Sequence, residues 1–413
     1  MHSTSDSVRT PFYTAHRLIS DLTCLRESEQ RFISSSTTYQ LQICTLSSIT
    51  PEWIAFQTRG ISTPFQQLEW ISAWLNTYSG KYKIYPFMLV VRSKQRIELL
   101  LPLMLEDSMS ASRLLCLGHK SNDYNAPLFA DAEALAMTDK DAKAIINDVA
   151  KYINADCVYI IKQPTKLVGT KNPFAQVNSR PFTSKTYGLD LSDGWPLVYT
   201  QARSGRTRQR ERNKLNRLRG GQAVQLRSIE DPTERGQLLE QAITWKSAQL
   251  DMAGTRNPFR EKHIRAHFRM LLEQADKSYC RLYVLEKNGH PLAICLGLIQ
   301  SKVFNYYFSA YNPNVPSSTS PGRMMMLKLV QLAARAKLKY FDFSLGDEPY
   351  KLELCGEGLP MTVSGFALTA KGYLRLKISW LRLSLKHHVK KSEEAMKVVK
   401  SMNQLQLFFR SKK

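Results

Sequence analysis

The sequence predicts an α/β fold with mixed sheets, arranged as two similar domains. The chain has 413 residues, of which 43% are hydrophobic, so it is long enough for two packed cores of ordinary size. One order of predicted elements, namely helix, β-hairpin, strand, helix and strand, occurs twice along the chain. This repeat favours a duplicated domain, although two unrelated mixed domains can share the same order.

Each half contains a predicted β-hairpin. In the first half, segment 85–105 has two apolar runs on either side of a polar turn, Ser93-Lys94-Gln95. In the second half, segment 280–299 has the turn Asn288-Gly289, which is the stronger signal because Asn and Gly tolerate the positive φ angles of tight turns. A predicted helix precedes each hairpin, near residues 68–76 and 262–276.

A strand, a helix and a second strand are predicted after each hairpin. The segments are 113–118, 139–153 and 157–161 in the first half, and 303–311, 321–337 and 340–344 in the second. A strand–helix–strand unit implies a parallel pair with a right-handed crossover, whereas a hairpin is antiparallel. Each sheet is therefore expected to be mixed, with ligands at the carboxyl ends of its strands.

Composition sets the expected boundaries. We expect a poorly ordered leader at 1–38, a first domain at 39–200, a second at 201–369 and a basic amphipathic tail at 370–413. The leader has no continuous apolar run, and its four acidic residues disfavour a transit peptide.

No uncharged apolar run reaches the roughly 18–20 residues of a membrane-spanning helix. The seven cysteines include no CxxC pair, which disfavours a disulfide framework or a zinc site and fits a reducing compartment. A cytoplasmic protein, free or peripheral at a membrane, is expected.

The formal net charge of +23 is concentrated in two segments. Residues 203–219 hold eight lysines and arginines against one glutamate, and residues 371–413 hold twelve against two. Such clusters suit polyanionic partners, namely cofactor phosphates, RNA or anionic lipid, although a solvated helix face has the same composition. Few aromatic residues interleave the first cluster, so nucleic acid is not the favoured partner.

The start of the basic tail suggests a membrane surface. Residues 372–391 alternate apolar and basic side chains around Trp380. Such a segment can lie in a headgroup layer, with leucines and the tryptophan inserted and the cations facing anionic lipid. The alternative is a terminal element that packs on the second domain with its charges in water.

The predicted helix at 321–337 begins with a possible phosphate site. Ser320 is placed to cap it, Pro321 suits the first helical position, and Gly322 permits close approach of a ligand. Free backbone amides and the cation of Arg323 would attract a phosphate. Ser-Pro-Gly also opens many helices that bind nothing.

The strand that follows this helix ends in ionisable residues. Asp342 stands between two phenylalanines, so strand alternation turns it away from their rings. Asp347, Glu348, Tyr350 and Lys351 follow within nine residues. Desolvated carboxylates beside Tyr and Lys can have shifted pKa values and move protons at neutral pH. The alternative is a partly buried Asp342–Lys351 ion pair that only braces the loop.

These residues resemble a known family. "FDFSLGDEPYK", placed after "SPGRMMMLKLVQLAARAK", is similar to GNAT-superfamily acetyltransferases of the CelD/BcsL type, which are related to the Fem peptidyltransferases with two GNAT-like folds in tandem. The resemblance covers about residues 39–369, and 63–75 is similar to the family's first-domain entry. It implies an acyl-CoA such as acetyl-CoA as co-substrate, no metal, and an amine acceptor. It also implies that strands 303–311 and 340–344 splay apart to admit the pantetheine arm.

The resemblance further implies roles for individual residues. Asp342 and Asp347 are the first candidates for the base, Tyr350 for protonation of the leaving thiolate, and Lys351 for holding acceptor or phosphate charge. The pyrophosphate would lie at Ser320, Gly322 and Arg323, although the loop otherwise departs from the usual GNAT pattern. Asp123 in "SNDYNAPL" is a further catalytic candidate, or a turn residue.

We therefore predict an N-acyltransferase that acylates an amine of a sugar, peptide or polysaccharide precursor, as in polysaccharide biosynthesis. Two alternatives stay open. One is a Fem-like transferase that uses an aminoacyl-tRNA donor. The other is a non-catalytic protein that binds a polyanion or a membrane and keeps the GNAT-like fold.

Overall fold

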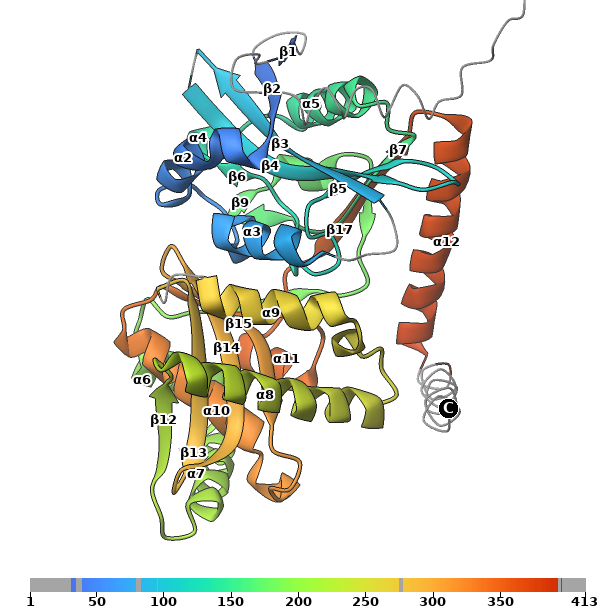
Figure 1. Cartoon of the computed structure of the whole chain (residues 1–413). Helices are drawn as coiled ribbons and strands as arrows, with labels where there is room; N and C mark the ends of the chain where they lie inside the picture. The colour runs from blue at the N-terminus through green and yellow to red at the C-terminus, as the bar shows by residue number, and fades with distance from the viewer. Residues whose placement is uncertain are drawn as a thin grey trace, which may run out of the picture. The chain divides into compact units, whose positions relative to one another are not determined.

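The computed structural model describes residues 31–34, 39–78, 83–94, 96–274, 278–392 and 395. The chain forms two compact units (Figure 1). Unit 1 comprises Met1–Ser62, Lys81–Pro181 and Thr362–Leu381, and unit 2 comprises Thr63–Gly80, Phe182–Met361 and Arg382–Lys413. Nearly all of the predicted leader and the last part of the predicted tail lie outside the described residues.

Unit 1 contains a mixed sheet, as predicted. Its strands are β1 (Arg31–Ser34), β2 (Gln40–Cys44), β3 (Lys83–Ser93), β4 (Arg96–Asp107), β5 (Arg113–Cys116), β6 (Leu128–Phe129), β7 (Cys157–Pro164), β10 (Ser179–Pro181) and β17 (Met361–Ala367). The order is β1-β2-β3-β4-β5-β7-β17-β10, with β6 beside β4. The hairpin β3–β4 is antiparallel and β5 pairs with β7 in parallel, which confirms the element order inferred for the first half.

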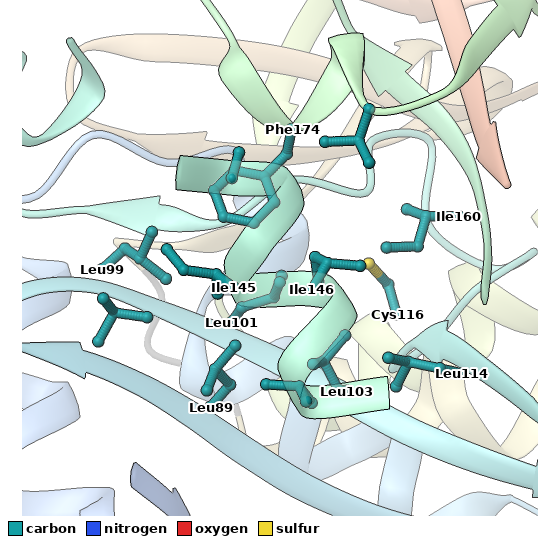
Figure 2. Packing of buried hydrophobic residues seen from close by; sticks show 14 of the residues in the cluster. Leu89, Leu99, Leu101, Leu103, Leu114, Cys116, Ile145, Ile146, Ile160 and Phe174 are labelled. Carbon is teal, nitrogen blue, oxygen red and sulfur yellow. The ribbon is translucent and has the colours of Figure 1, made fainter. Parts of the chain in front are cut away.

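One face of this sheet is covered by helix α5 (Asp139–Tyr152). Thr138 caps α5 in a capping box with Asp141, since each residue's side chain accepts a hydrogen bond from the other's backbone N–H. Figure 2 shows Ile145 and Ile146 facing leucines of β3, β4 and β5, and all of these side chains are buried. Their burial, at about 1.5–3 kcal/mol for each large aliphatic side chain, holds the helix on the sheet. Unit 1 also contains α2 (Leu46–Gln57), α4 (Ala132–Leu135), η2 (Pro173–Gln176) and a small hairpin of β8 (Lys166–Leu167) and β9 (Thr170–Lys171).

Unit 2 contains the second mixed sheet. Its strands are β11 (Thr186–Asp190), β12 (Val224–Ser228), β13 (Cys280–Lys287), β14 (His290–Gln300), β15 (Val303–Tyr311) and β16 (Tyr340–Leu345), in the order β11-β16-β15-β14-β13-β12. The β13–β14 turn has φ 51° at Asn288 and 76° at Gly289, as its sequence predicts. β15 and β16 are parallel, which confirms the second strand–helix–strand unit.

Unit 2 also contains several helices. They are α3 (Leu68–Thr77), α6 (Trp195–Ala202), α7 (Gly205–Arg219), α8 (Pro232–Met252), α9 (Lys262–Gln274), α10 (Pro321–Arg335) and α11 (Pro349–Cys355), with short turns η1 (Pro64–Gln66), η3 (Pro258–Arg260) and η4 (Ser317–Thr319). α7 ends at Gly220 in the left-handed conformation that glycine favours at helix C-termini. In Figure 1, α8 and α9 run in front of β13–β15, and both contact this sheet.

Elements from each half of the chain belong to the unit formed mainly by the other half. β11, at the end of the first half, pairs with β16 of unit 2, and β17, near the end of the second half, lies beside β7 of unit 1. α3 packs on α9 in unit 2, where Trp70 lies 4.5 Å from the ring of His267. The units therefore interleave along the chain, whereas the expected domains 39–200 and 201–369 are continuous.

Helix α12 (Ala370–Lys391) follows β17 and contains no acidic residue. Its residues up to Leu381 belong to unit 1 and the rest to unit 2. Within the part of the chain that the structure describes, no helix combines the length and the apolarity needed to cross a bilayer.

The buried imidazole of His267 makes the stability of unit 2 depend on pH. The residue is 2% exposed, and burial lowers the pKa of His267 to about 4. An unfolded histidine has a pKa of about 6.5. As the pH falls below that value, the unfolded chain binds a proton that folded unit 2 does not, so the free energy of unfolding decreases until the pH reaches the folded pKa.

Urea unfolding is expected to reveal this linkage. Between about pH 7.5 and pH 5, the His267 contribution should lower the free energy of unfolding of unit 2 by about 2 kcal/mol. The variant His267→Phe should lack this contribution. The control is His290→Gln, which changes an exposed histidine and should retain the His267 contribution. An unaltered pH dependence in His267→Phe would contradict the assignment.

Candidate functional site

The parallel strands β15 and β16 pair over only part of their length. Their ladder joins Val303 with Tyr340, Phe304 with Phe341, and Asn305 with Asp342. β15 continues to Tyr311 and β16 to Leu345, and no further pair joins the two. The strands therefore diverge on the carboxyl side of Asn305 and Asp342, the edge at which α/β sheets bind ligands.

A β-bulge in each strand explains the divergence. Between the pairs Leu298–Asn305 and Leu296–Phe308, two β15 residues, Tyr306 and Tyr307, stand opposite Gly297 of β14. On the other side, two residues of β16 stand opposite one residue of β11, and Ser344 has a φ of 64°. An extra residue bends a strand and interrupts its ladder. Both bulges start directly after the last β15–β16 pair, so both strands turn at the same level.

Asp342 lies at the point where the strands separate and is 8% exposed. Its Oδ1 accepts a hydrogen bond from the backbone N–H of Ser344 at 2.7 Å, and its Oδ2 accepts one from Asn305 Nδ2 at 2.9 Å. The carboxylate thus joins the β16 bulge to the last paired residue of β15. Phe341 and Phe343 are buried with their rings 4.8 Å apart, in agreement with the prediction that Asp342 faces away from them.

In unit 1, the chain itself fills the equivalent position. β5 and β7 pair over two residues, after which β5 ends. Asn125 then donates from its backbone N–H to Lys162 O at 2.9 Å and from Nδ2 to Ile161 O at 2.8 Å, both on β7. Asn122 donates to Asn125 Oδ1 at 2.8 Å, and both asparagines are buried. These bonds use β7 backbone groups that a ligand would need, so unit 2 is the better candidate for a site between strands.

Helix α11 brings Tyr350 and Lys351 to the carboxyl end of β16. Lys351 is 3% exposed, donates to Leu345 O at 3.2 Å and forms an ion pair with Glu348 at 2.8 Å. Burial, with a smaller contribution from Glu348, raises the pKa of Tyr350, so its hydroxyl keeps its proton at neutral pH. Burial also raises the pKa of Tyr306, which belongs to the β15 bulge.

Lys246 of α8 is a further member of this cluster. Burial lowers the pKa of Lys246, Glu348 opposes that shift, and Lys351 adds to it. Lys246 stands 102 positions before Glu348 in an ordinary helical segment, so no local pattern marks it. Only the packing of α8 on the sheet places its ammonium group near this strand end.

Asp347 has several partners in unit 2. It accepts hydrogen bonds from Lys185 N at 3.0 Å, from Tyr187 Oη at 3.3 Å and from Lys390 Nζ of α12. Burial acts to raise the pKa of Asp347, but these bonds outweigh it and hold the pKa below the ordinary value. A carboxylate of low pKa is a weak proton acceptor at neutral pH. The geometry therefore favours Asp347 as a fixed anchor for this loop.

The start of α10 differs from the predicted phosphate site. Ser320 precedes α10 in a left-handed conformation and does not cap it, so that prediction is wrong; its hydroxyl accepts from Lys214 Nζ at 3.1 Å. Arg323 forms ion pairs with Glu211 at 3.0 Å and with Glu353 at 2.9 Å. These carboxylates offset much of the cationic charge that the sequence analysis assigns to the site. A methyl group added to Gly322 would lie 3.3 Å from the Tyr311 ring, so the space beside it is narrow.

A cationic groove of about 280 Å³ lies along α7 and α10. Its lining includes Arg208, Arg212, Arg219 and Lys328, together with Trp195 and Tyr199, whose rings stack at 4.6 Å. Cations beside stacked aromatic rings suit an anionic ligand with a planar group.

Asp123, the remaining predicted catalytic residue, belongs to unit 1. Its carboxylate lies 3.6 Å from Lys162 Nζ, on the segment that contains Asn122 and Asn125. The structure brings Asp342, Tyr350 and Lys351 to one end of β16 in unit 2, with Asp347 on the same loop. Ser320, Gly322 and Arg323 lie at the start of α10, after β15.

Comparison with known proteins agrees with this geometry. Residues 205–352 match the family described as the acetyltransferase (GNAT) domain. The structure is similar to the crystal structure of FemX, with a TM-score of 0.53 and 11% identity, over 85% of this chain and 100% of that one. No curated protein matches the sequence.

Two further solved structures are similar over most of their length. L-PGS from Bacillus licheniformis has 11% identity and a TM-score of 0.45, over 77% of this chain and 96% of that one. A tandem GNAT protein from the clavulanic acid biosynthesis pathway has 12% identity and a TM-score of 0.40, over 80% and 98%.

The mixed sheets, the repeated element order and the FemX-like fold confirm the predicted α/β fold with tandem GNAT-like domains. The family match supports transferase chemistry of the acyl class. Residues 205–352 thus match the acetyltransferase (GNAT) domain family, within a chain whose fold is similar to that of FemX.

Proposed function

We propose that the protein is an N-acyltransferase of the CelD/BcsL type. It would move an acetyl or longer acyl group from acyl-CoA to an amine of a sugar, peptide or polysaccharide precursor. The observation that carries this proposal is the divergence of β15 and β16 after three pairs, with a bulge in each strand. A pantetheine arm contains amide groups that can pair with strand backbone, so it suits a gap between two diverging strands.

The proposed reaction forms one bond and breaks one. The amine nitrogen attacks the thioester carbon, the carbon–sulfur bond breaks, the nitrogen loses a proton and the thiolate gains one. Tyr350, whose pKa is raised by burial, is the proposed donor to the thiolate. Asp342 is the proposed acceptor of the amine proton, and Lys351 and Lys246 supply positive charge near the developing oxyanion.

The nucleotide end of the donor would meet the start of α10. Backbone N–H groups at a helix start attract phosphate even without a side-chain cation. Because Glu211 and Glu353 pair with Arg323, we expect this contact to rely on the backbone near Gly322.

We also propose a cytoplasmic location, because the seven cysteines include no CxxC pair and do not suggest a disulfide framework.

The experiment is thiol release from acetyl-CoA in the presence of a panel of amines, combined with retention on immobilised CoA. The variant Gly322→Trp, which fills the narrow space beside Tyr311, should weaken CoA retention about 10-fold or more. Gly236→Trp is the matched control, since nothing lies within 4 Å of a methyl group added there. Absence of turnover and of retention with every thioester donor would overturn the proposal.

A second candidate is transfer from an aminoacyl-tRNA. The cations of α7 and the groove beside them favour it, because they would contact nucleic-acid phosphates. Charge reversal at Arg212 should then weaken binding of tRNA strongly, and aminoacyl-tRNA should replace acyl-CoA as the productive donor. Binding of RNA or lipid without turnover of either donor would favour a non-catalytic protein.

A further inference from the structure

Helix α12 has two apolar faces, of which one is buried. Leu376 and Trp380 are 6% and 7% exposed. The indole ring of Trp380 lies 4.6 Å from the Arg180 guanidinium and 5.8 Å from the Tyr159 ring. The expectation that Trp380 inserts into a headgroup layer is therefore wrong, because this side chain anchors α12 within unit 1.

The opposite face of α12 carries an exposed apolar stripe. Leu374, Ile378, Leu381 and Leu385 are 64%, 38%, 61% and 57% exposed. Their spacings of four, three and four residues place them on one line along the helix. Exposed aliphatic side chains are ordinary when scattered, but four in register on one helix form a continuous apolar surface that water solvates poorly.

Cations flank this stripe on both sides. α12 holds seven lysines and arginines and no aspartate or glutamate. At 100° per residue, Lys371 and Arg382 lie on one side of the stripe and Lys377 on the other. Long basic side chains can keep their stems along an apolar surface while their charges reach phosphate groups.

We propose that this face of α12, defined by Leu374, Ile378, Leu381 and Leu385 with its flanking lysines and arginines, docks the protein on an anionic phospholipid bilayer. The stripe is one row of side chains wide, which suits shallow insertion into a headgroup layer. Lys371, Lys377 and Arg382 beside the stripe, on a helix without an acidic residue, complement the negative surface of such a bilayer. α12 lies on this surface, since it does not meet the requirements for a spanning helix.

Flotation of the full chain with vesicles tests the proposal. Binding is expected to vesicles of phosphatidylcholine and phosphatidylglycerol, to decrease with salt, and to be weak with phosphatidylcholine alone. The variant Leu374→Gln with Leu385→Gln should weaken binding about 30-fold. The control, Ile54→Gln with Leu197→Gln, changes two side chains that are 49% and 48% exposed outside α12 and should bind normally.

A second pair of variants tests the charges. Lys377→Glu with Arg382→Glu should weaken vesicle binding at least about 30-fold. Lys140→Glu with Lys166→Glu imposes the same change of net charge at exposed positions in unit 1 and should have a much smaller effect. Thiol release with a soluble amine should be equal in all these variants, so a failure of docking is distinguishable from a failure of the proposed reaction.

Three results would overturn the proposal. The first is equal vesicle binding by the Leu374→Gln, Leu385→Gln variant and the wild type. The second is complete loss of binding when residues 396–413 alone are removed, because the docking surface would then lie in that segment. The third is a self-association of the wild type that the leucine substitutions abolish, since a second copy would then cover the stripe.

Discussion

Replacing Asp342 with leucine is expected to abolish acyl transfer and to destabilise unit 2 by about 3–5 kcal/mol. The substitution leaves the backbone N–H of Ser344 and the side-chain amide of Asn305 buried without the carboxylate that accepts their hydrogen bonds. A buried polar group that loses its partner costs about 1–3 kcal/mol, and loss of a buried charged partner costs more. The β16 bulge, in which Ser344 has a positive φ, loses the hydrogen bond that holds its conformation. The strands β15 and β16 should then no longer diverge at a defined residue.

The variant Asp342→Asn separates the two roles of this residue. An asparagine can still accept from Ser344 N, and Asn305 can turn its amide so that its Oδ1, a buried atom without a hydrogen-bond partner among the described residues, accepts from the new side chain. The fold is therefore expected to survive, with a melting temperature close to that of the wild type. If Asp342 accepts the amine proton, kcat should fall about 100- to 10,000-fold and the acidic limb of the pH profile should disappear.

Thermal unfolding and the pH dependence of thiol release check these expectations together. Asp190→Asn is a suitable control. Asp190 lies on β11 opposite Tyr340, the first residue of β16, and its carboxylate accepts a hydrogen bond from the nearby Ser192 backbone N–H. Full activity in Asp342→Asn would show that Asp342 positions the strands and that another group accepts the proton. Full activity and stability in Asp342→Leu would contradict the account of the site.

Removal of residues 361–413 is expected to unfold unit 1, although most residues of unit 2 remain in the shortened chain. β17 lies between β7 and β10 in the unit 1 sheet, and Val363 within it is fully buried. Ser364 accepts a hydrogen bond from Gln163 Nε2 at 2.7 Å and donates one to Phe174 O at 3.1 Å. Loss of this strand and of buried Leu376 and Trp380 should cost more than about 5 kcal/mol, which is comparable to the whole stability of a domain.

Circular dichroism and limited proteolysis of the shortened chain measure this effect. Cleavage is expected throughout residues 83–181 in the chain that ends at Pro360. A chain that ends at Ala395 keeps β17 and α12 and should resist proteolysis like the full chain. Cooperative unfolding of unit 1 in the absence of residues 361–413 would contradict the strand exchange.

Much of the local structure can be predicted from the sequence. Asn288-Gly289 specifies a tight turn whatever surrounds it, because its φ angles depend on two residues. Gly220 likewise ends α7, and alternation along β16 buries Phe341 and Phe343 away from Asp342. These features depend on contacts within a few residues, which is why the repeat and the α/β class follow from pattern alone.

Tertiary structure decided which elements pair across long distances. β11 and β17 are short strands with hydrogen-bonding edges, and nothing in their sequence selects β16 or β7 as a partner. The amphipathic face of α3 would suit either sheet, yet it packs on α9. Lys246 and Lys390 reach the candidate site from positions about 100 residues before and 40 after it.

The repeated α/β elements, their turns and the polar end of β16 thus follow from local sequence patterns. The divergence of β15 and β16 is expected from the sequence only through the family resemblance, and the residues at which it begins are fixed by tertiary contacts. Their divergence needs two bulges at one level, and those bulges depend on Gly297 and Tyr187 in neighbouring strands and on the bond between Asp342 and Asn305, 37 residues apart. Such geometry arises from the balance of many distant contacts, which no short sequence pattern encodes.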